Sequence, residues 1–150
     1  MMKEVHYRFN NLEDLIDRVH ALFAKPDAGL PLPPENENLR YRVQLTIHEW
    51  LANLIQHAHF GNRAPTIELT IRSNGRIVEC FIDDNSEGFD LNGRLEANPS
   101  IQEAFPERGM GLHFIRACTQ KLSYIRLKDG RHRLVFTLAN DEDPWLDIPF

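Results

Sequence analysis

The stretch from residue 37 to residue 59 constrains the fold most, because it is predicted to form a helix that carries a stripe of polar side chains. Glu49, Asn53 and His57 follow one another at intervals of four residues. Since a helix turns once per about 3.6 residues, these side chains stack along one face, about 6 Å apart. Many of the other side chains are apolar, namely Leu45, Ile47, Trp50, Leu51, Leu54, Ile55 and Ala58. Burying a polar stripe costs free energy unless it faces a ligand or a partner, so the stripe is a candidate site.

Length and composition indicate a single domain over residues 1–150. A chain of 150 residues has an ordinary domain size, and a hydrophobic content of 42% is sufficient for a core. The net charge of −5 argues against a nucleic-acid-binding surface. The apolar runs are too short for a membrane span, and the first residues lack the apolar segment of a signal peptide. Cys80 and Cys118 are expected to be reduced core thiols, which favours a cytoplasmic protein.

Periodicity predicts five strands and three helices. Alternation of apolar and polar residues predicts strands at 3–9, 66–72, 76–83, 122–128 and 132–138. Helical spacing predicts helices from the Asn11 cap to Phe23, at 37–59, and from Gly109 onward. The third helix is expected to turn four side chains inward: Leu112, Ile115, Cys118 and Leu122.

The order of these elements favours an α+β two-layer sandwich. Strands that are neighbours in the sequence pair in hairpins, and Asn74-Gly75 is expected to supply the positive φ angles of the first one. The sheet is therefore expected to be mixed but mainly antiparallel, with helices on one face. Residues 91–108 carry no periodic pattern and are predicted to be a functional loop, and the tail at 141–150 is acidic and aromatic.

Three segments supply groups that suit a nucleotide. On the helix, the amide oxygen of Asn53 suits Mg²⁺, and the carboxylate of Glu49 can accept a proton from an attacking hydroxyl. Asp84, at a strand end, can accept a hydrogen bond from an exocyclic amine such as adenine N6, and Gly88 lets the backbone approach a base closely. The segment Arg108-Gly-Met-Gly-Leu112 offers an arginine, and backbone N–H groups at a helix start, to phosphate.

In this order and spacing, the three segments resemble the N, G1 and G2 boxes of the GHKL ATPase superfamily, which includes gyrase, histidine kinases and mismatch-repair ATPases. The resemblance covers residues 40–125 and implies the Bergerat fold, with ATP and Mg²⁺ bound. The short chain and the motif Glu-x-x-x-Asn-x-x-x-His resemble the bacterial anti-sigma factor serine/threonine kinases. Members of that family bind a sigma factor and phosphorylate an antagonist protein of the STAS type. They often dimerise, so the resemblance is also compatible with a homodimer.

The resemblance implies a role for each site residue. Asn53 resembles the Mg²⁺-binding asparagine, Glu49 the general base that activates a serine of the partner, and Asp84 the aspartate that reads adenine. Residues 91–108 would be the ATP lid. The other nucleotide-binding positions implied by the resemblance are His57, Gly88, Arg108, Gly109, Met110, Gly111 and Leu112.

Ser86 departs from the family pattern, which has a glycine two residues after the aspartate. A residue other than glycine is expected to adopt the required conformation at a cost. Glu87 adds negative charge nearby, and the lid contains no lysine, only Arg94 and Arg108. These features favour a second hypothesis, a non-catalytic module that holds a partner while ATP is structural or absent.

A third hypothesis is a detached histidine-kinase catalytic domain, which acts on a separate phosphoacceptor histidine. The dipeptide His48-Glu49 suggests two other functions. It occurs at the phosphoacceptor of histidine kinases, but here Glu49 belongs to the N box and no separate pair of dimerisation helices precedes it. It also occurs in zinc proteases, but their motif needs another histidine four residues after His48, where Ala52 stands. His48 is therefore expected to be structural or exposed. For His57, a structural role and a place beside the ligand are equally compatible with the sequence.

Overall fold

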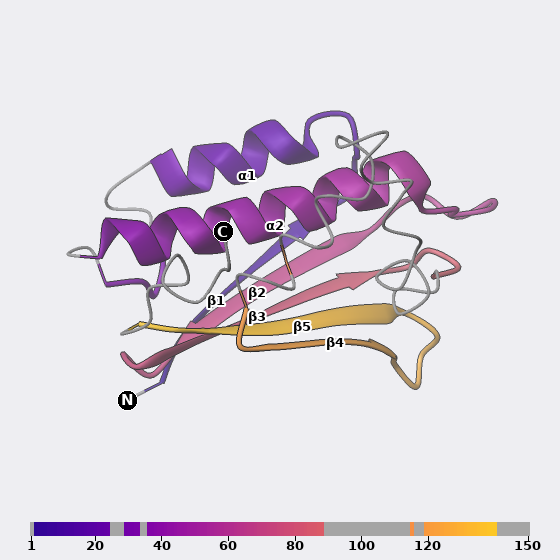
Figure 1. The fold of residues 1–150 in the computed structure, drawn as a ribbon. Helices are drawn as coiled ribbons and strands as arrows, with labels where there is room; N and C mark the ends of the chain where they lie inside the picture. The colour runs from indigo at the N-terminus through magenta and orange to yellow at the C-terminus, as the bar shows by residue number, and fades with distance from the viewer. Residues whose placement is uncertain (1, 25–28, 34–35, 89–114, 116–118, 141–150) are drawn as a thin grey trace, which may run out of the picture.

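The computed structural model describes residues 2–24, 29–33, 36–88, 115 and 119–140. Its helices and strands follow the predicted order (Figure 1): β1 (Lys3–Phe9), α1 (Leu15–Ala24), α2 (Glu37–His57), β2 (Ile67–Ser73), β3 (Ile77–Asp84), β4 (Lys121–Arg126) and β5 (His132–Ala139). The predicted lid, the segment from Arg108 to Leu112, Cys118 and the tail lie outside the described residues. Within the described ranges, no helix combines the length and the apolar character that a membrane span requires.

The described strands form one antiparallel sheet in the order β1-β2-β3-β5-β4. Both α1 and α2 lie on the same face of this sheet (Figure 1), so the predicted α+β two-layer sandwich is confirmed. Leu122, which was predicted both as the last inward residue of the third helix and as the first residue of a strand, lies in β4, so only the strand prediction is confirmed for it. Sheet pairing already begins at Gln120, whose N–H donates to the carbonyl of Thr137 at 2.8 Å. Ile115 is helical and buried, as predicted.

The core lies between the inner face of the sheet and the two helices. β2 alternates strictly between buried and half-buried positions, with Ile67, Leu69 and Ile71 turned toward the helices. α2 buries apolar side chains at helical spacing, among them Trp50, which is fully buried. Burying one such side chain contributes about 1.5–3 kcal/mol, so this shared face holds the two layers together. Cys80 belongs to this core as a free thiol whose pKa is raised, chiefly by burial, which confirms its predicted role.

Local side-chain contacts set the element boundaries. Asn36 caps α2, because its Oδ1 accepts from the N–H of Leu39 at 2.9 Å. Asn11 instead bonds the N–H of Glu13, and α1 begins later than predicted, at Leu15. In the β2–β3 hairpin only Gly75 has a positive φ, of 91°. The expectation for Asn74 was therefore wrong.

Asn74 has a different role in this turn. The loop spans three residues between Ser73 and Ile77, and the side chain of Asn74 accepts from the N–H groups of Arg76 and Ile77, both at 2.9 Å. An asparagine that bonds the backbone ahead of it forms a turn without a left-handed conformation of its own. The hairpin is thus stabilised by a side chain and one glycine rather than by two positive φ angles.

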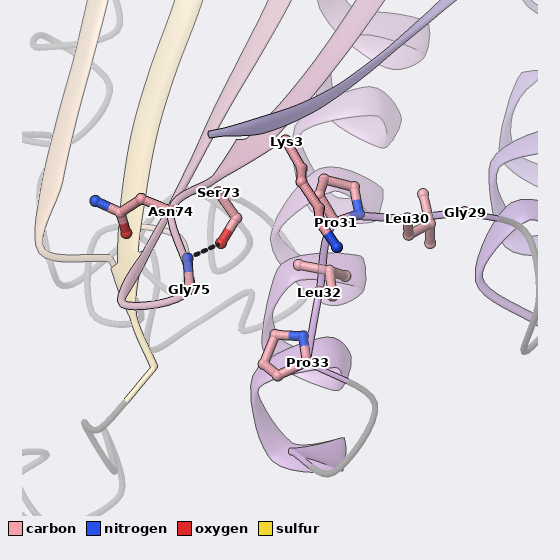
Figure 2. A pocket seen from close by; sticks show the side chains of 9 residues that line it. All are labelled: Lys3, Gly29, Leu30, Pro31, Leu32, Pro33, Ser73, Asn74 and Gly75. Atoms are coloured by element: carbon pink, nitrogen blue, oxygen red, sulfur yellow. Dashed lines mark hydrogen bonds between the residues drawn. The ribbon is translucent and has the colours of Figure 1, made fainter. Parts of the chain in front are cut away.

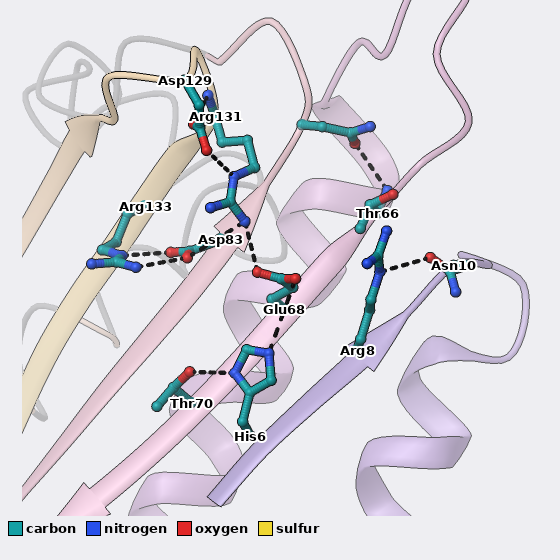
Figure 3. A network of polar contacts seen from close by, with 11 residues as sticks. His6, Arg8, Asn10, Thr66, Glu68, Thr70, Asp83, Asp129, Arg131 and Arg133 are labelled. Carbon is teal, nitrogen blue, oxygen red and sulfur yellow. Dashed lines mark hydrogen bonds and ion pairs between the residues drawn. The ribbon is translucent and has the colours of Figure 1, made fainter. Parts of the chain in front are cut away.

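The outer face of the sheet carries an ion-pair network near the ends of β2, β3 and β5 (Figure 3). Arg133 donates to both carboxylate oxygens of Asp83, at 2.6 and 2.8 Å, and Arg131 donates to Glu68 at 2.6 Å. Because strand residues alternate in direction, Asp83 joins this network while its neighbour Asp84 points toward the helices. The network therefore holds in place the end of β3 that presents Asp84.

Replacing Arg133 by Met should lower the free energy of unfolding by about 2 kcal/mol, because the Asp83 carboxylate loses its bidentate partner. Asp83 is only 5% exposed, so water cannot fully replace that partner. Urea denaturation measures the change. The control is Arg126→Met, which removes the same charge from an exposed position and should alter stability by less than about 0.5 kcal/mol. Equal effects of the two substitutions would show that the pair does not stabilise the fold.

Candidate functional site

The predicted stripe lies at the margin of the buried face of α2. Glu49 and Asn53 are half-buried, whereas His57, the last residue of the helix, is exposed. The Nδ2 atom of Asn53 is buried and has no hydrogen-bond partner among the described residues. Leaving a buried N–H donor without an acceptor costs about 1–3 kcal/mol, which favours a ligand beside Asn53 over a purely structural role for this residue. His57 gains no comparable support.

Asp84 is the last residue of β3 and is fully buried on the inner face of the sheet. One carboxylate oxygen, Oδ1, accepts from the backbone N–H of Ser86 at 2.9 Å and from the Ser86 hydroxyl. The other oxygen, Oδ2, is buried and has no partner among the described residues. Burial raises the pKa of Asp84, and the two hydrogen bonds from Ser86 offset part of that rise. A buried carboxylate with one unused oxygen is an acceptor suited to a ligand N–H.

Ser86 does not strain the backbone, so the expected conformational cost at this position was wrong. Among the described residues, positive φ angles occur only at glycines. Ser86 is 1% exposed, and its hydroxyl donates to Asp84 while accepting from the N–H of Gly88 at 3.1 Å. The serine thus connects the aspartate to the following glycine. A glycine at position 86 would have no side chain to make this connection.

Four hydrogen bonds tie the loop after β3 to the segment after α2. The N–H of Glu87 donates to the carbonyl of His59 at 2.8 Å, and Arg63 donates to the carbonyl of Asn85 at 3.0 Å. The Asn85 side chain donates to the carbonyl of Ala64 at 2.8 Å and accepts from the N–H of Thr66 at 2.9 Å. These bonds bring the loop beside the end of the helix that carries Asn53, as the nucleotide-site prediction requires.

Gly88 lies against the ring of His132. Its φ is +78°, and a Cβ atom at this position would come within 2.5 Å of Nε2 of His132. The same ring also stacks on Tyr124, with centroids 5.5 Å apart and an interplanar angle of 16°. His132 pairs directly with Asp84 across the β3–β5 ladder. Gly88 was predicted to let the backbone approach a base, whereas the group that the described residues place beside it is the side chain of His132.

The sequence prediction did not include Asn85 or His132 in the site. A signal for His132 exists, because it begins a strand whose inward positions, two and four residues later, are Leu134 and Phe136. A histidine at an inward position of an apolar strand is the same kind of anomaly as the stripe on α2. No comparable signal exists for Asn85, whose contacts join it to residues about 20 positions earlier.

Two cavities lie away from Asp84. One, of about 220 Å³, borders Glu49 and is also lined by His20 and His48, whose Nε2 and Nδ1 atoms are hydrogen-bonded at 2.9 Å. His48, predicted to be structural or exposed, is half-buried and bonded to His20, which agrees with the structural alternative. The other, of about 380 Å³, lies between the segment 29–33 and the β2–β3 hairpin (Figure 2). Its described lining includes none of the predicted site residues.

The groups on α2 fit magnesium better than they fit a metal held by the protein alone. Mg²⁺ at phosphate sites takes one or two protein oxygens and completes its shell with phosphate and water. Asn53 offers a carboxamide oxygen, and the carboxylate of Glu49, the predicted base, lies one turn earlier. Within the described ranges, no group of three or more His, Cys, Asp or Glu side chains is placed to hold a metal ion. A magnesium ion shared with phosphate is thus compatible with this donor set.

Residues 28–138 match the histidine kinase-like ATPase domain family. The chain belongs to this family. Membership implies ATP binding, and it confirms the family predicted from the N, G1 and G2 boxes. The matched range contains Glu49, Asn53 and Asp84. Serine/threonine-protein kinase BtrW of Bordetella bronchiseptica is 34% identical over 101 residues, which cover 66% of this chain and 70% of that relative.

Replacing Gly88 by Ala should destabilise this ATPase domain more than replacing Gly75 by Ala. Both glycines have positive φ angles, so each substitution costs about 1–2 kcal/mol of backbone energy. Only at Gly88 does the new methyl group meet a neighbour, the His132 ring, whereas nothing lies within 4 Å of the Cβ position at Gly75. Overpacking should add about 1–3 kcal/mol. Urea denaturation of both variants measures the difference, and equal losses would mean that the ring moves aside freely.

Replacing Asp84 by Asn should abolish nucleotide binding without lowering stability at pH 7. The amide keeps an acceptor for Ser86 but presents N–H groups where the ligand needs an acceptor. Because burial raises the native pKa of Asp84 above 3.8, ionisation of the wild-type carboxyl opposes folding at neutral pH. The wild type should therefore gain stability relative to the variant as the pH falls through that raised native pKa toward 3.8.

Calorimetric titration with ATP and urea denaturation at several pH values test this expectation. Asp83→Asn is the matched control, since it changes the neighbouring carboxylate on the outer face. That variant should lose stability and keep its affinity for ATP. An Asp84→Asn protein that binds ATP as the wild type does would exclude Asp84 from the nucleotide site.

Proposed function

We propose that this ATPase domain, as a single unit over residues 1–150, is a serine/threonine protein kinase of the anti-sigma factor type. The observation that carries nucleotide binding is the unused Oδ2 atom of the buried Asp84. In the proposal this oxygen accepts a hydrogen bond from adenine N6, and Gly88 allows the loop to approach the base. The similarity to a protein named as a serine/threonine-protein kinase supports the kinase activity.

Glu49 is the proposed general base. It is half-buried on α2, one turn before Asn53, and in the proposal its carboxylate faces the phosphate end of the nucleotide. In the proposed step, Glu49 accepts the proton of a serine hydroxyl on the partner as that oxygen bonds to the γ-phosphorus. The bond from the γ-phosphorus to its bridging oxygen breaks, and ADP leaves. Positioning and charge neutralisation supply most of the rate in such reactions.

Asn53 is the proposed protein ligand of magnesium. Its carboxamide oxygen would be the donor that α2 offers to the ion, and a bound Mg²⁺ would neutralise charge on the phosphates. The segment from Arg108 to Leu112 is proposed to bind the phosphates through its N–H groups and its arginine, with residues 91–108 as the lid. His57, exposed at the end of α2, is proposed only to border this pocket.

The proposed partners are proteins. The phosphorylated substrate would be an antagonist of the STAS type, and the kinase itself would sequester a sigma factor or a similar regulator in the cytoplasm. A homodimer is compatible with this function, whereas binding to nucleic acid or to a membrane forms no part of it. The experiment that tests it is phosphotransfer from γ-labelled ATP to the cognate antagonist, with and without Mg²⁺. Acid-stable label on serine is the expected result.

Two other results would replace this proposal. Acid-labile label on a histidine would identify a detached histidine-kinase catalytic domain. Absence of label, with no stabilisation by millimolar Mg-ATP, would identify a non-catalytic module. ATP at 100 times its Kd should stabilise a binding-competent protein by about 2.7 kcal/mol, which a thermal shift detects readily.

Glu49→Gln should slow phosphotransfer by about 100-fold or more, because the amide cannot accept the serine proton. Binding of Mg-ATP should change little, since the variant keeps the size and polarity of the side chain. Glu37→Gln, which removes a carboxylate from the first turn of the same helix, is the matched control and should phosphorylate at the wild-type rate. Single-turnover labelling compares the three proteins. Transfer by Glu49→Gln at the control rate would exclude Glu49 as the base.

A further inference from the structure

The residue across the sheet from Asp84 has an unused polar atom of its own. Nδ1 of His132 is buried and has no hydrogen-bond partner among the described residues, as is true of Oδ2 of Asp84. The two residues are direct partners in the β3–β5 register, so their side chains leave the same face of the sheet. Cβ atoms of such partners lie about 4.5–5.5 Å apart, a spacing that allows both atoms to reach one ligand edge.

His132 is held rigidly in this place. Its ring is stacked on Tyr124, and Gly88 leaves room for it, since even a methyl group at that position would come within 2.5 Å. Gly88 in turn donates to the Ser86 hydroxyl, which donates to Asp84. A continuous set of contacts therefore fixes the imidazole relative to the carboxylate, as a recognition site requires.

The chemistry of the two atoms matches one kind of ligand edge. An ionised carboxylate only accepts, so Oδ2 of Asp84 calls for a donor, whereas one nitrogen of a neutral imidazole can donate. The 6-amino group of adenine is a donor, and N1 beside it is an acceptor. Hypoxanthine and guanine reverse both groups, with an oxygen at C6 and a hydrogen on N1. The pair would then face two mismatches, each with a buried group left unsatisfied.

We propose that His132 is a second base-reading residue, which donates from Nδ1 to N1 of adenine while Asp84 accepts from the 6-amino group. This inference rests on the proposed ATP site and adds a specificity-determining residue to it. The histidine selects the nucleotide that the kinase uses and takes no part in the transfer of the phosphoryl group.

The test measures the affinities of two nucleotides for two proteins. 1-Deaza-ATP has a C–H group in place of N1 and keeps the 6-amino group. The wild type should bind ATP about tenfold more tightly than 1-deaza-ATP. His132→Phe keeps an aromatic ring on Tyr124 but has no Nδ1, so it should bind both nucleotides equally. Because the affinities of two ligands are compared on each protein, a substitution that weakens the binding of both equally leaves their ratio unchanged.

Two further variants keep the test valid if His132→Phe disturbs the fold. His132→Gln places its amide near the Nε2 position rather than the Nδ1 position, and it should also lose the preference for ATP over 1-deaza-ATP. His132→Asn places an amide near Nδ1 and should keep part of that preference. Thermal melting shows which variants are folded. ITP, whose base is hypoxanthine, is the nucleotide with the donor and acceptor reversed. The ratio by which it binds more weakly than ATP should be smaller in the Phe and Gln variants than in the wild type.

The outcomes separate this inference from the proposed function. One outcome refutes the role of His132 and leaves the ATP site standing. In it, the wild type binds ATP and the Asp84→Asn variant does not, but the ratio of affinities for ATP and 1-deaza-ATP is the same in the wild type as in His132→Phe and His132→Gln. If the wild type binds neither nucleotide, both proposals fail together. A preference for ATP that His132→Phe and His132→Gln abolish supports the inference.

Discussion

The antiparallel sheet has one face buried beneath helices and one face that carries charges, and the other features of this domain depend on that division. Inward positions of β2, β3 and β5 form the core with α2. Because the side chains of neighbouring residues in a strand point to opposite faces, Asp83 and Asp84 at the end of β3 lie on opposite faces of the sheet. The first is held by Arg133 in an outer ion pair, and the second is buried with one oxygen unused among the described residues. Two adjacent residues of one type thereby acquire different tasks.

Ser86 shows how a departure from a family pattern can be compatible with the site. Its hydroxyl and N–H occupy one oxygen of Asp84, while its hydroxyl also accepts from the N–H of Gly88. The contact leaves the second oxygen of Asp84 open and links the carboxylate to the glycine that packs on His132. A glycine at this position would keep the backbone N–H bond to Asp84 but would lack the hydroxyl, so only water or the ligand could link the carboxylate to Gly88.

Much of the candidate site was predictable from local patterns. The stripe on α2 depends only on helical spacing, and the family membership that it helped to predict is confirmed by the match over residues 28–138. The boundaries of β1 and the start of α2 were predicted closely, because alternation and helical spacing act within a few residues. The turn at Asn74 was predicted in place but not in conformation, since a side-chain hydrogen bond replaced one of the two positive φ angles.

The sequence by itself determined the order of the described elements and the two-layer class, and it predicted candidate residues for the N and G1 boxes, because these depend on periodicity and on side-chain chemistry along the chain. Only the tertiary structure decided which oxygen of Asp84 lacks a partner among the described residues, and that His132 lies opposite Asp84. It also decided that Asn85 ties the loop after β3 to the segment after α2. These facts arise from contacts between residues about 20 to 50 positions apart. Strand order and register bring such residues together, and no pattern within a single segment specifies either of them.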